Sequence, residues 1–244
     1  MKTITIAQQK GGTGKTTTAH AIGAGLREQG KRVLSVDLDA QANLSYIMGA
    51  KLDGLTVLDV LKGTAAAAAI QKTDGGNIIP GTPFLAGADA MFSGKVYALA
   101  EALKPIAKRF DFCVIDTPPA LGALTVAALT AADSVIIPCL PDVLSIQAIG
   151  QISETIEGIR STCNPKLKTA GILLTRYTQR QKLTKDTETI LERAAEGIGT
   201  RLFKTRIRET VSIREAQAMG MSIYAYSPRS AGAIDYTHFL QEII

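Results

Sequence analysis

The sequence contains no tryptophan and only three cysteines, and the cysteines are too few and too scattered for a disulfide framework or a zinc cluster. Cys113, Cys139 and Cys163 are an odd number without close pairing. We therefore expect reduced thiols that are mostly buried, as free cysteines usually are.

Long hydrophobic runs are also missing. The longest apolar-leaning stretch, residues 120–140, is interrupted by Thr, Asp and Ser and flanked by Pro119 and Pro141, so no membrane span is expected. An alternating segment begins directly after Met1 and leaves no room for the apolar region of a signal peptide, which predicts a cytoplasmic protein. No repeat and no Pro- or Ser-rich linker divides the chain, and residues 1–244 are expected to form a single domain.

Acidic residues are scarce in the C-terminal third. The whole chain carries 27 Lys and Arg against 22 Asp and Glu, a formal net charge of +5. Residues 160–229 hold 14 of the basic and 6 of the acidic residues, whereas the rest of the chain has 13 against 16. This uneven distribution of charge indicates a polyanion partner for the C-terminal third, but it does not bear on the fold.

Short apolar runs alternate with helical patterns along the chain. Predicted strands cover residues 3–7, 32–36, 112–115, 134–137 and 169–174, and predicted helices cover residues 15–29, 96–109, 121–131, 146–161 and 185–196. The five alanines at 65–69 are expected to form a helix turn without function. Near-continuous apolar strands followed by helices predict an α/β fold, a mostly parallel twisted sheet with helices on both faces. Ligands of such sheets bind at the carboxyl ends of the strands.

A glycine-rich loop follows the first predicted strand and opens the first predicted helix. The loop consists of Gly11, Gly12, Thr13 and Gly14, and Lys15 and Thr16 follow it. Glycines let backbone N–H groups converge on phosphate oxygens, and the helix N-terminus adds its positive dipole end. Lys15 can reach the β- and γ-phosphates, and the Thr16 hydroxyl can ligate Mg²⁺. The usual pattern has Gly where this chain has Gln9, but the loop still predicts a nucleoside triphosphate site.

Three carboxylates fall at the same predicted edge of the sheet. Asp37 and Asp116 each follow a short apolar run, and Asp39 lies two residues beyond Asp37. Phosphoryl transfer needs an oriented water, a metal at the phosphates and positive charge on the developing oxyanions. Asp116 is suited to hold a Mg²⁺-bound water, and Asp39 to orient the attacking water. Asp37 supports the metal waters or the loop, although alone it could be a helix N-cap.

The stretch Lys10–Thr17, KGGTGKTT, resembles the deviant Walker A motif of the ParA/MinD superfamily of P-loop NTPases, in which a signature lysine precedes the glycines. Its lead-in, Gln9 and Lys10, resembles the ParA branch more than the Gly-Lys of MinD and nitrogenase iron proteins. Residues 33–45, 111–125, 132–149, 171–186 and 203–236 also resemble ParA proteins. This chain departs from the family pattern where it has Ala40 and Arg208 in place of prolines.

The resemblance implies a Mg²⁺-dependent ATPase that hydrolyses ATP to ADP and phosphate in a sandwich homodimer. Lys10, which could otherwise be a solvated lysine, would reach the nucleotide of the partner subunit. The expected catalytic residues are Lys10, Lys15 and Asp39. The expected nucleotide-binding residues are Lys10, Gly11, Gly12, Thr13, Gly14, Lys15, Thr16, Thr17 and Arg208, with the backbone near Arg208 at the adenine. The expected metal ligands are Thr16, Asp37 and Asp116.

Basic residues of the C-terminal third form two groups, either of which could be an ordinary solvated face. Lys204, Arg206, Arg208 and Arg214 surround a predicted turn and short helix, and Arg176, Arg180, Lys182 and Lys185 form the second group. The resemblance implies that the ATP dimer binds DNA non-specifically through this region. The expected DNA-binding residues are Arg176, Arg180, Lys182, Lys204, Arg206, Arg208 and Arg214. No helix-turn-helix or zinc-finger pattern precedes the first strand, so sequence-specific operator binding is not expected.

The expected function is partitioning of a plasmid or chromosome, or cargo positioning, with hydrolysis stimulated by a ParB-type adaptor or centromere-binding protein and with nucleoid association of the ATP form. One alternative is a MinD-like membrane-bound regulator. Residues 231–244 contain no Lys or Arg, unlike a membrane-targeting helix, and are expected to dock onto the domain. Another alternative is a P-loop metabolic synthetase, which would lack Lys10 and the pair Asp37 and Asp39. A nitrogenase-type reductase would need cluster cysteines in loops, whereas Cys113 and Cys139 fall in or at the ends of predicted strands.

Overall fold

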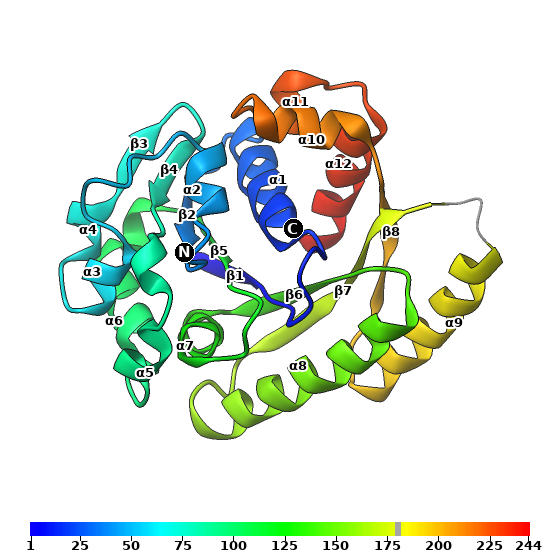
Figure 1. Ribbon diagram of the computed structural model, residues 1–244, viewed down its shortest axis with the longest axis horizontal. Helices are drawn as coiled ribbons and strands as arrows, with labels where there is room; N and C mark the ends of the chain where they lie inside the picture. Colours follow the sequence, from blue (N-terminus) through cyan, green and yellow to red (C-terminus); the bar gives the residue numbers. More distant parts are fainter. Residues whose placement is uncertain (179–181) are drawn as a thin grey trace.

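The computed structural model describes the backbone of residues 1–178 and 182–244, and the side chains of these residues except 89, 143 and 182–186. Within them, eight strands form one sheet in the order β3-β4-β2-β5-β1-β6-β7-β8 (Figure 1). The strands are β1 (Lys2–Ile6), β2 (Val33–Asp37), β3 (Gln71–Thr73), β4 (Gly76–Ile79), β5 (Phe112–Asp116), β6 (Ser134–Cys139), β7 (Lys168–Tyr177) and β8 (Leu202–Arg208). Among these eight strands only β3 and β4 pair antiparallel, so the expected mostly parallel sheet is confirmed.

Helices cover both faces of the sheet, as expected (Figure 1). One face carries α1 (Lys15–Glu28), α2 (Asn43–Ile47), α10 (Val211–Ala218), α11 (Ile223–Tyr226) and α12 (Ala231–Ile243). The other face carries α3 (Val57–Leu61), α4 (Ala66–Ala69), α5 (Ala88–Phe92), α6 (Ala98–Leu103), α7 (Ala123–Ala131), α8 (Val143–Thr162) and α9 (Lys182–Gly197). Two short 3₁₀ segments, η1 (Pro83–Leu85) and η2 (Lys104–Arg109), lie on this same face of the sheet.

The central strands are apolar on both sides because both sides are covered. In β6, Ile136 packs in the cluster beneath α1, whereas Val135 and Ile137 pack toward α8. This alternation follows from the two-residue period of a strand. Cys113 and Cys139 are buried in the two clusters on the α8 side, as expected, and Cys163 is half-buried. The covered sheet holds the start of α1 at the carboxyl end of β1.

Helix α12 docks onto the domain, as expected. Its Phe239 ring meets Phe203 of β8 edge-on, with ring centroids 4.9 Å apart, and Leu240 is buried against α1. Within the described residues, no helix has the length and apolar character needed to cross a membrane.

One expectation about local structure was wrong. Residues 96–109 do not form one helix, because Pro105 lacks the N–H that α-helical pairing needs, and the chain continues from α6 into η2. Lys204, Arg206 and Arg208 lie on strand β8, which the sequence did not predict, and the predicted short helix follows as α10, which carries Arg214. In β8, Phe203 and Ile207 are buried, but the charged residues of the strand obscure the alternation of buried and exposed positions that would have predicted it. The β3–β4 hairpin and the short helices α2, α3 and α5 were not expected either.

Candidate active site

The glycine-rich loop leads directly into α1 and leaves the first turn of that helix open. Gly12 and Gly14 adopt positive φ angles of 72° and 82°, which side chains with a Cβ rarely tolerate. Gly14 is the N-cap of α1, no side chain caps the helix, and its first turn contains no acidic residue. The Thr175 hydroxyl donates to the Thr13 carbonyl at 2.8 Å and so ties the loop to β7. The unsatisfied N–H groups and the helix dipole form an anion site.

Lys15 lies at the base of this loop. Its side chain is 7% exposed, and Nζ donates to the carbonyl of Lys10 at 3.4 Å. Burial lowers the pKa of Lys15, while the nearby charges of Asp116 and Asp39 oppose that shift. The expected lysine and two of the three expected carboxylates therefore share one site.

Asp116 is buried at the end of β5, with Ile6 of β1 as its register partner on one side and Asp37 of β2 on the other. Neither of its carboxylate oxygens has a hydrogen-bond partner within the described residues. Burial and the charge of Asp37 raise the pKa of Asp116 well above its usual range, and the Thr16 hydroxyl and Lys15 oppose them. A buried carboxylate without a partner beside a hydroxyl fits a divalent metal ion.

Asp37 is also fully buried, but its oxygens are occupied. Oδ1 accepts the N–H of Asp39 at 3.1 Å, and Oδ2 accepts the N–H and hydroxyl of Ser45 at 2.9 and 2.7 Å. Burial raises the pKa of Asp37 to about 6, against the hydrogen bonds from Ser45. Ala42 is the N-cap of α2, so Asp37 does not take that position, yet it satisfies an N–H in the first turn of α2. Its contacts position the Asp39 loop, and metal ligation by Asp37 stays a prediction.

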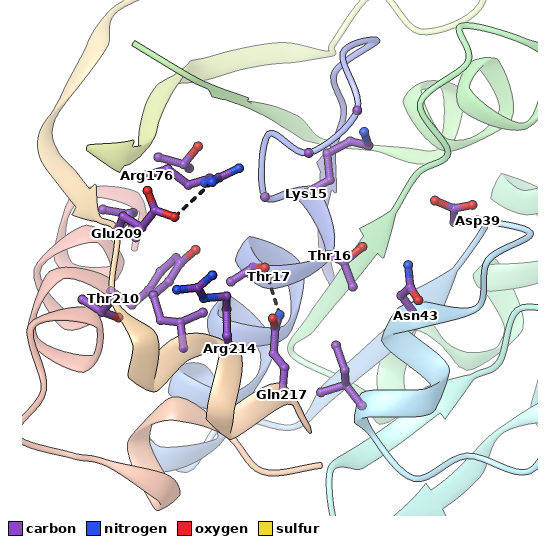
Figure 2. Close-up of a pocket in the computed structure, with 18 of the residues that line it drawn as sticks. Lys15, Thr16, Thr17, Asp39, Asn43, Arg176, Glu209, Thr210, Arg214 and Gln217 are labelled. Atoms are coloured by element: carbon purple, nitrogen blue, oxygen red, sulfur yellow. Dashed lines mark hydrogen bonds and ion pairs between the residues drawn. The ribbon is translucent and has the colours of Figure 1, made fainter. Parts of the chain in front are cut away.

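Asp39 is half-buried and borders the cleft on the side where Lys15 and Thr16 lie (Figure 2). Its backbone is fixed by Asp37, and its Oδ1 accepts the N–H of Gln41 at 3.0 Å. The hydrogen bond to Gln41 uses one carboxylate oxygen and fixes the orientation of the group at the edge of the cleft. This arrangement suits a carboxylate that must orient a water.

Lys10 does not extend into solvent. Its Nζ lies 2.6 Å from Oδ2 of Asp142, and the two side chains are 24% and 39% exposed. Asp142 is the N-cap of α8 and accepts the N–H of Ser145 through its other oxygen at 2.9 Å. Lys10 is therefore held by a residue of its own chain.

A cleft of about 650 Å³ runs from the phosphate loop to the ends of β8 and α10. The cleft is lined by seven residues that the sequence predicts to bind the nucleotide, Gly11, Gly12, Gly14, Lys15, Thr16, Thr17 and Arg208, and by Asp39, which it predicts to be catalytic. Lys10 and Thr13, also predicted to bind the nucleotide, are not among the lining residues. The sequence did not indicate the further lining residues Asn43, Tyr46, Ile47, Pro119, Thr175, Thr210, Ile213, Gln217 and Tyr236. They come from α2, β7, α10, α12 and the segments between elements, and only the tertiary fold brings them together. Gln217 donates to the Thr17 hydroxyl at 2.9 Å and joins α10 to α1 (Figure 2).

The predicted DNA-binding residues do not form one free basic surface. Arg176 forms an ion pair with Glu209 at 3.0 Å, and Arg208 forms one with Asp235 at 2.6 Å. Arg206 donates a hydrogen bond to Glu188 at 2.6 Å. Lys204 and Arg214 are both exposed, and Arg214 also lines the cleft. Arg180 lies outside the described residues, and Lys182 begins α9 with its side chain not described.

A phosphate loop at the start of α1, with an unpaired buried carboxylate at the next strand end, places this chain among the P-loop nucleoside triphosphatases. The family model described as an AAA domain matches residues 1–169. The chain is 35% identical over 244 residues to the chromosome-partitioning ATPase Soj of Thermus thermophilus, covering 100% of this chain and 96% of that protein. It is 33% identical over 254 residues to the chromosome partitioning protein ParA of Caulobacter vibrioides, covering 100% and 94%. The chain belongs to the family of Soj and ParA partitioning ATPases.

A solved structure gives the same fold. The structure described as cobyrinic acid a,c-diamide synthase from Mycobacterium smegmatis, with bound ADP and magnesium, matches with a TM-score of 0.85 and 37% identity, over 99% of this chain and 93% of that one. The expected deviant Walker A fold is confirmed by this match and by the partitioning relatives.

Proposed function

We propose that this protein is a Mg²⁺-dependent ATPase that dimerises on ATP, binds DNA non-specifically in that state and drives DNA partitioning or cargo positioning. The observation that carries the proposal is the arrangement of Lys15, Asp39 and the unpaired Asp116 around the open N-terminus of α1. The partitioning relatives and the ADP- and magnesium-bound neighbour support it.

The residues fit a nucleotide with its metal. The N–H groups at the start of α1 bind phosphate oxygens, and Lys15 pairs with the β- and γ-phosphates. Thr16 and Asp116 would hold Mg²⁺, which when bound neutralises charge on those phosphates. Within the described residues no group of three His, Cys, Asp or Glu could hold a metal, but Mg²⁺ at a nucleotide needs only one or two carboxylates plus phosphate oxygens and waters. Asp39 accepts a hydrogen bond from the attacking water and fixes its direction, so that the water lies in line with the leaving oxygen.

In this proposal the active site is complete only in the dimer, because each site needs Lys10 of the partner subunit. Lys15 already supplies the cation of the loop, and a second lysine adds most where it reaches the nucleotide of the partner subunit. A cation supplied in this way to a phosphoryl-transfer site raises the rate by about 10³ to 10⁵. The ion pair with Asp142 holds Lys10 in the single chain and must open before the lysine can reach across.

DNA binding by the ATP dimer rests on the net positive charge of residues 160–229 and on the partitioning relatives. Lys204 is exposed on β8 and is a proposed DNA contact, together with Arg180 and Lys182, which the sequence predicts. A ParB-type adaptor or centromere-binding protein would stimulate hydrolysis, and we expect a cytoplasmic protein that associates with the nucleoid when ATP is bound.

Sedimentation with and without ATP and arbitrary duplex DNA tests the proposal. The wild-type protein should be monomeric without ATP, dimeric with it, and should sediment with DNA only in the second state. Lys15→Ala should abolish ATP binding, and Asp39→Ala should bind ATP and remain dimeric. An Asp39→Ala protein that stays monomeric in saturating ATP contradicts the mechanism.

The name of the Mycobacterium smegmatis neighbour favours a synthetase as the second candidate. A synthetase has no use for a lysine that acts across a dimer, or for Asp39 as the residue that orients water. ATP consumption by the protein alone, without any acid or amide donor, supports the ATPase. Consumption that requires such a co-substrate supports the synthetase.

A further inference from the structure

Three arginines line the cleft beside the phosphate loop, and two of them are already paired. Arg176 pairs with Glu209 at 3.0 Å, and Arg208 makes a two-pronged contact with Asp235 at 2.6 and 2.9 Å. Arg214 has no hydrogen bond and no ion pair with any part of the chain that the structure describes. Its charge is therefore available to a ligand in the cleft.

The position of Arg214 relative to α1 follows from its neighbour on the same helix. Arg214 and Gln217 are three residues apart on α10, so their side chains lie next to each other on one helix face. Gln217 donates to the hydroxyl of Thr17 at 2.9 Å. Figure 2 shows the Arg214 side chain in the cleft beside Thr17. The guanidinium thus faces the first turn of α1 from the side of α10.

This side of the cleft is not where the terminal phosphate would lie. Asp39 borders the opposite side, with Lys15 and Thr16 between (Figure 2). In a phosphate loop the lysine reaches the β- and γ-phosphates, and the N–H groups of the loop cradle the α- and β-phosphates. A group beside Thr17, on the side away from Asp39, meets the nucleotide near its α-phosphate.

We propose that Arg214 is a nucleotide-binding residue that pairs with the α-phosphate of the bound nucleotide. The proposal rests on the ATP binding proposed above, and it moves Arg214 from the DNA surface to the nucleotide site. A guanidinium suits a phosphate because its planar fork can donate two parallel hydrogen bonds. The α-phosphate is present in both ATP and ADP. Arg214 therefore adds equally to the affinity for both nucleotides, while Lys10, Lys15 and Asp39 act at the end where the two differ.

The test measures MgATP and MgADP affinity by calorimetry for the wild type, Arg214→Gln, Arg214→Lys and the control Arg193→Gln, which removes an exposed arginine of α9. Arg214→Gln should weaken both affinities by about 10-fold and leave their ratio unchanged, since a charge-assisted hydrogen bond is removed from each complex. Arg214→Lys should recover part of the loss, and Arg193→Gln should match the wild type.

Each other outcome contradicts the proposal in a different way. Unchanged affinities for both nucleotides mean that Arg214 does not touch the ligand, and a loss confined to ATP moves its contact to the terminal phosphate. Weaker DNA binding at saturating ATP with unchanged nucleotide affinity returns Arg214 to the DNA surface. A folded wild-type protein that binds no ATP contradicts the proposed function itself, which separates the two failures.

Discussion

Lys10 and Asp142, 132 positions apart in the sequence, form an ion pair in which Nζ and Oδ2 lie 2.6 Å apart. Burial acts to raise the pKa of Asp142, but hydrogen bonds from Lys10 and Ser145 outweigh it and lower the pKa. The carboxylate therefore stays charged at neutral pH and keeps its hold on the lysine. In the proposed dimer this pair must separate, so it opposes dimerisation.

Asp142→Asn should strengthen ATP-dependent dimerisation. Asparagine remains a good N-cap for α8 but no longer attracts the lysine electrostatically. A partly exposed pair contributes about 0.5 kcal/mol, and two pairs open per dimer, so the dimer dissociation constant should fall roughly fivefold.

Sedimentation at several protein concentrations in saturating ATP measures this change. Glu157→Gln is a suitable control, because it removes a carboxylate of α8 that pairs with Arg160 instead. Equal or weaker dimerisation of Asp142→Asn would show that the pair does not restrain Lys10.

His20 should make the stability of the nucleotide-free protein depend on pH. Burial and the charge of Arg27 lower the pKa of His20 from 6.5 to about 4. Because the folded protein binds this proton less readily than the unfolded chain, stability is complete above pH 6.5 and is lost as the pH falls toward 4.

Denaturant unfolding at pH 7 and pH 5 checks the prediction. The free energy of unfolding should drop by roughly 2 kcal/mol from this group between the two values, given the 1.36 kcal/mol that corresponds to one pKa unit. His20→Gln should remove that part of the pH dependence, and an identical drop in the variant would assign it to other groups.

The chemistry at the strand ends could be predicted from the sequence because it is local. Gly14 and Lys15 follow a strand pattern, and Asp37 and Asp116 each end an apolar run, so the rule that parallel strands share one carboxyl edge brings them together. The register confirms this, since Asp37 and Asp116 are paired residues on adjacent strands.

The partners of these residues could not be predicted, because they come from distant parts of the chain. Gln217 reaches Thr17 across 200 positions, and Asp235 neutralises Arg208 across 27. A charge count along the sequence cannot tell a paired arginine from a free one. The charge count therefore gave no sign that Arg176, Arg206 and Arg208 are paired, or that Arg214 lines the cleft.

Gly25→Ala should destabilise the packing of α1. A Cβ at this position would meet Leu240 Cδ1 at 2.3 Å and the Tyr224 hydroxyl at 2.7 Å. Overpacking of this kind costs about 1–3 kcal/mol. Gly158→Ala on α8 is the matched control, because its Cβ meets nothing within 4 Å and alanine favours a helix by about 1 kcal/mol over glycine. Thermal unfolding should shift down for the first variant and up for the second.

Lys204→Ala, combined with Arg180→Ala and Lys182→Ala, should weaken DNA binding without changing ATP hydrolysis in the absence of DNA. Lys204 is exposed on β8 and does not line the nucleotide cleft. For every phosphate that is no longer neutralised, the slope of log affinity against log salt should decrease by about 0.9 in magnitude. Affinity that is unchanged at all salt concentrations would move the DNA surface away from these residues.

Replacement by asparagine should affect Mg²⁺-dependent nucleotide binding at Asp116 and the stability of the fold at Asp37. Asp116 has no hydrogen-bond partner within the described residues, so Asp116→Asn should not lower the stability of the metal-free protein, but it should abolish the Mg²⁺ dependence of nucleotide binding. Asp37 accepts three hydrogen bonds from Ser45 and Asp39, and Asp37→Asn should cost about 1–3 kcal/mol of stability. Thermal unfolding without metal, together with Mg²⁺ titration of nucleotide binding, measures both effects. If Asp37→Asn keeps its stability and loses only the Mg²⁺ response, Asp37 is a metal ligand and not the residue that positions Asp39.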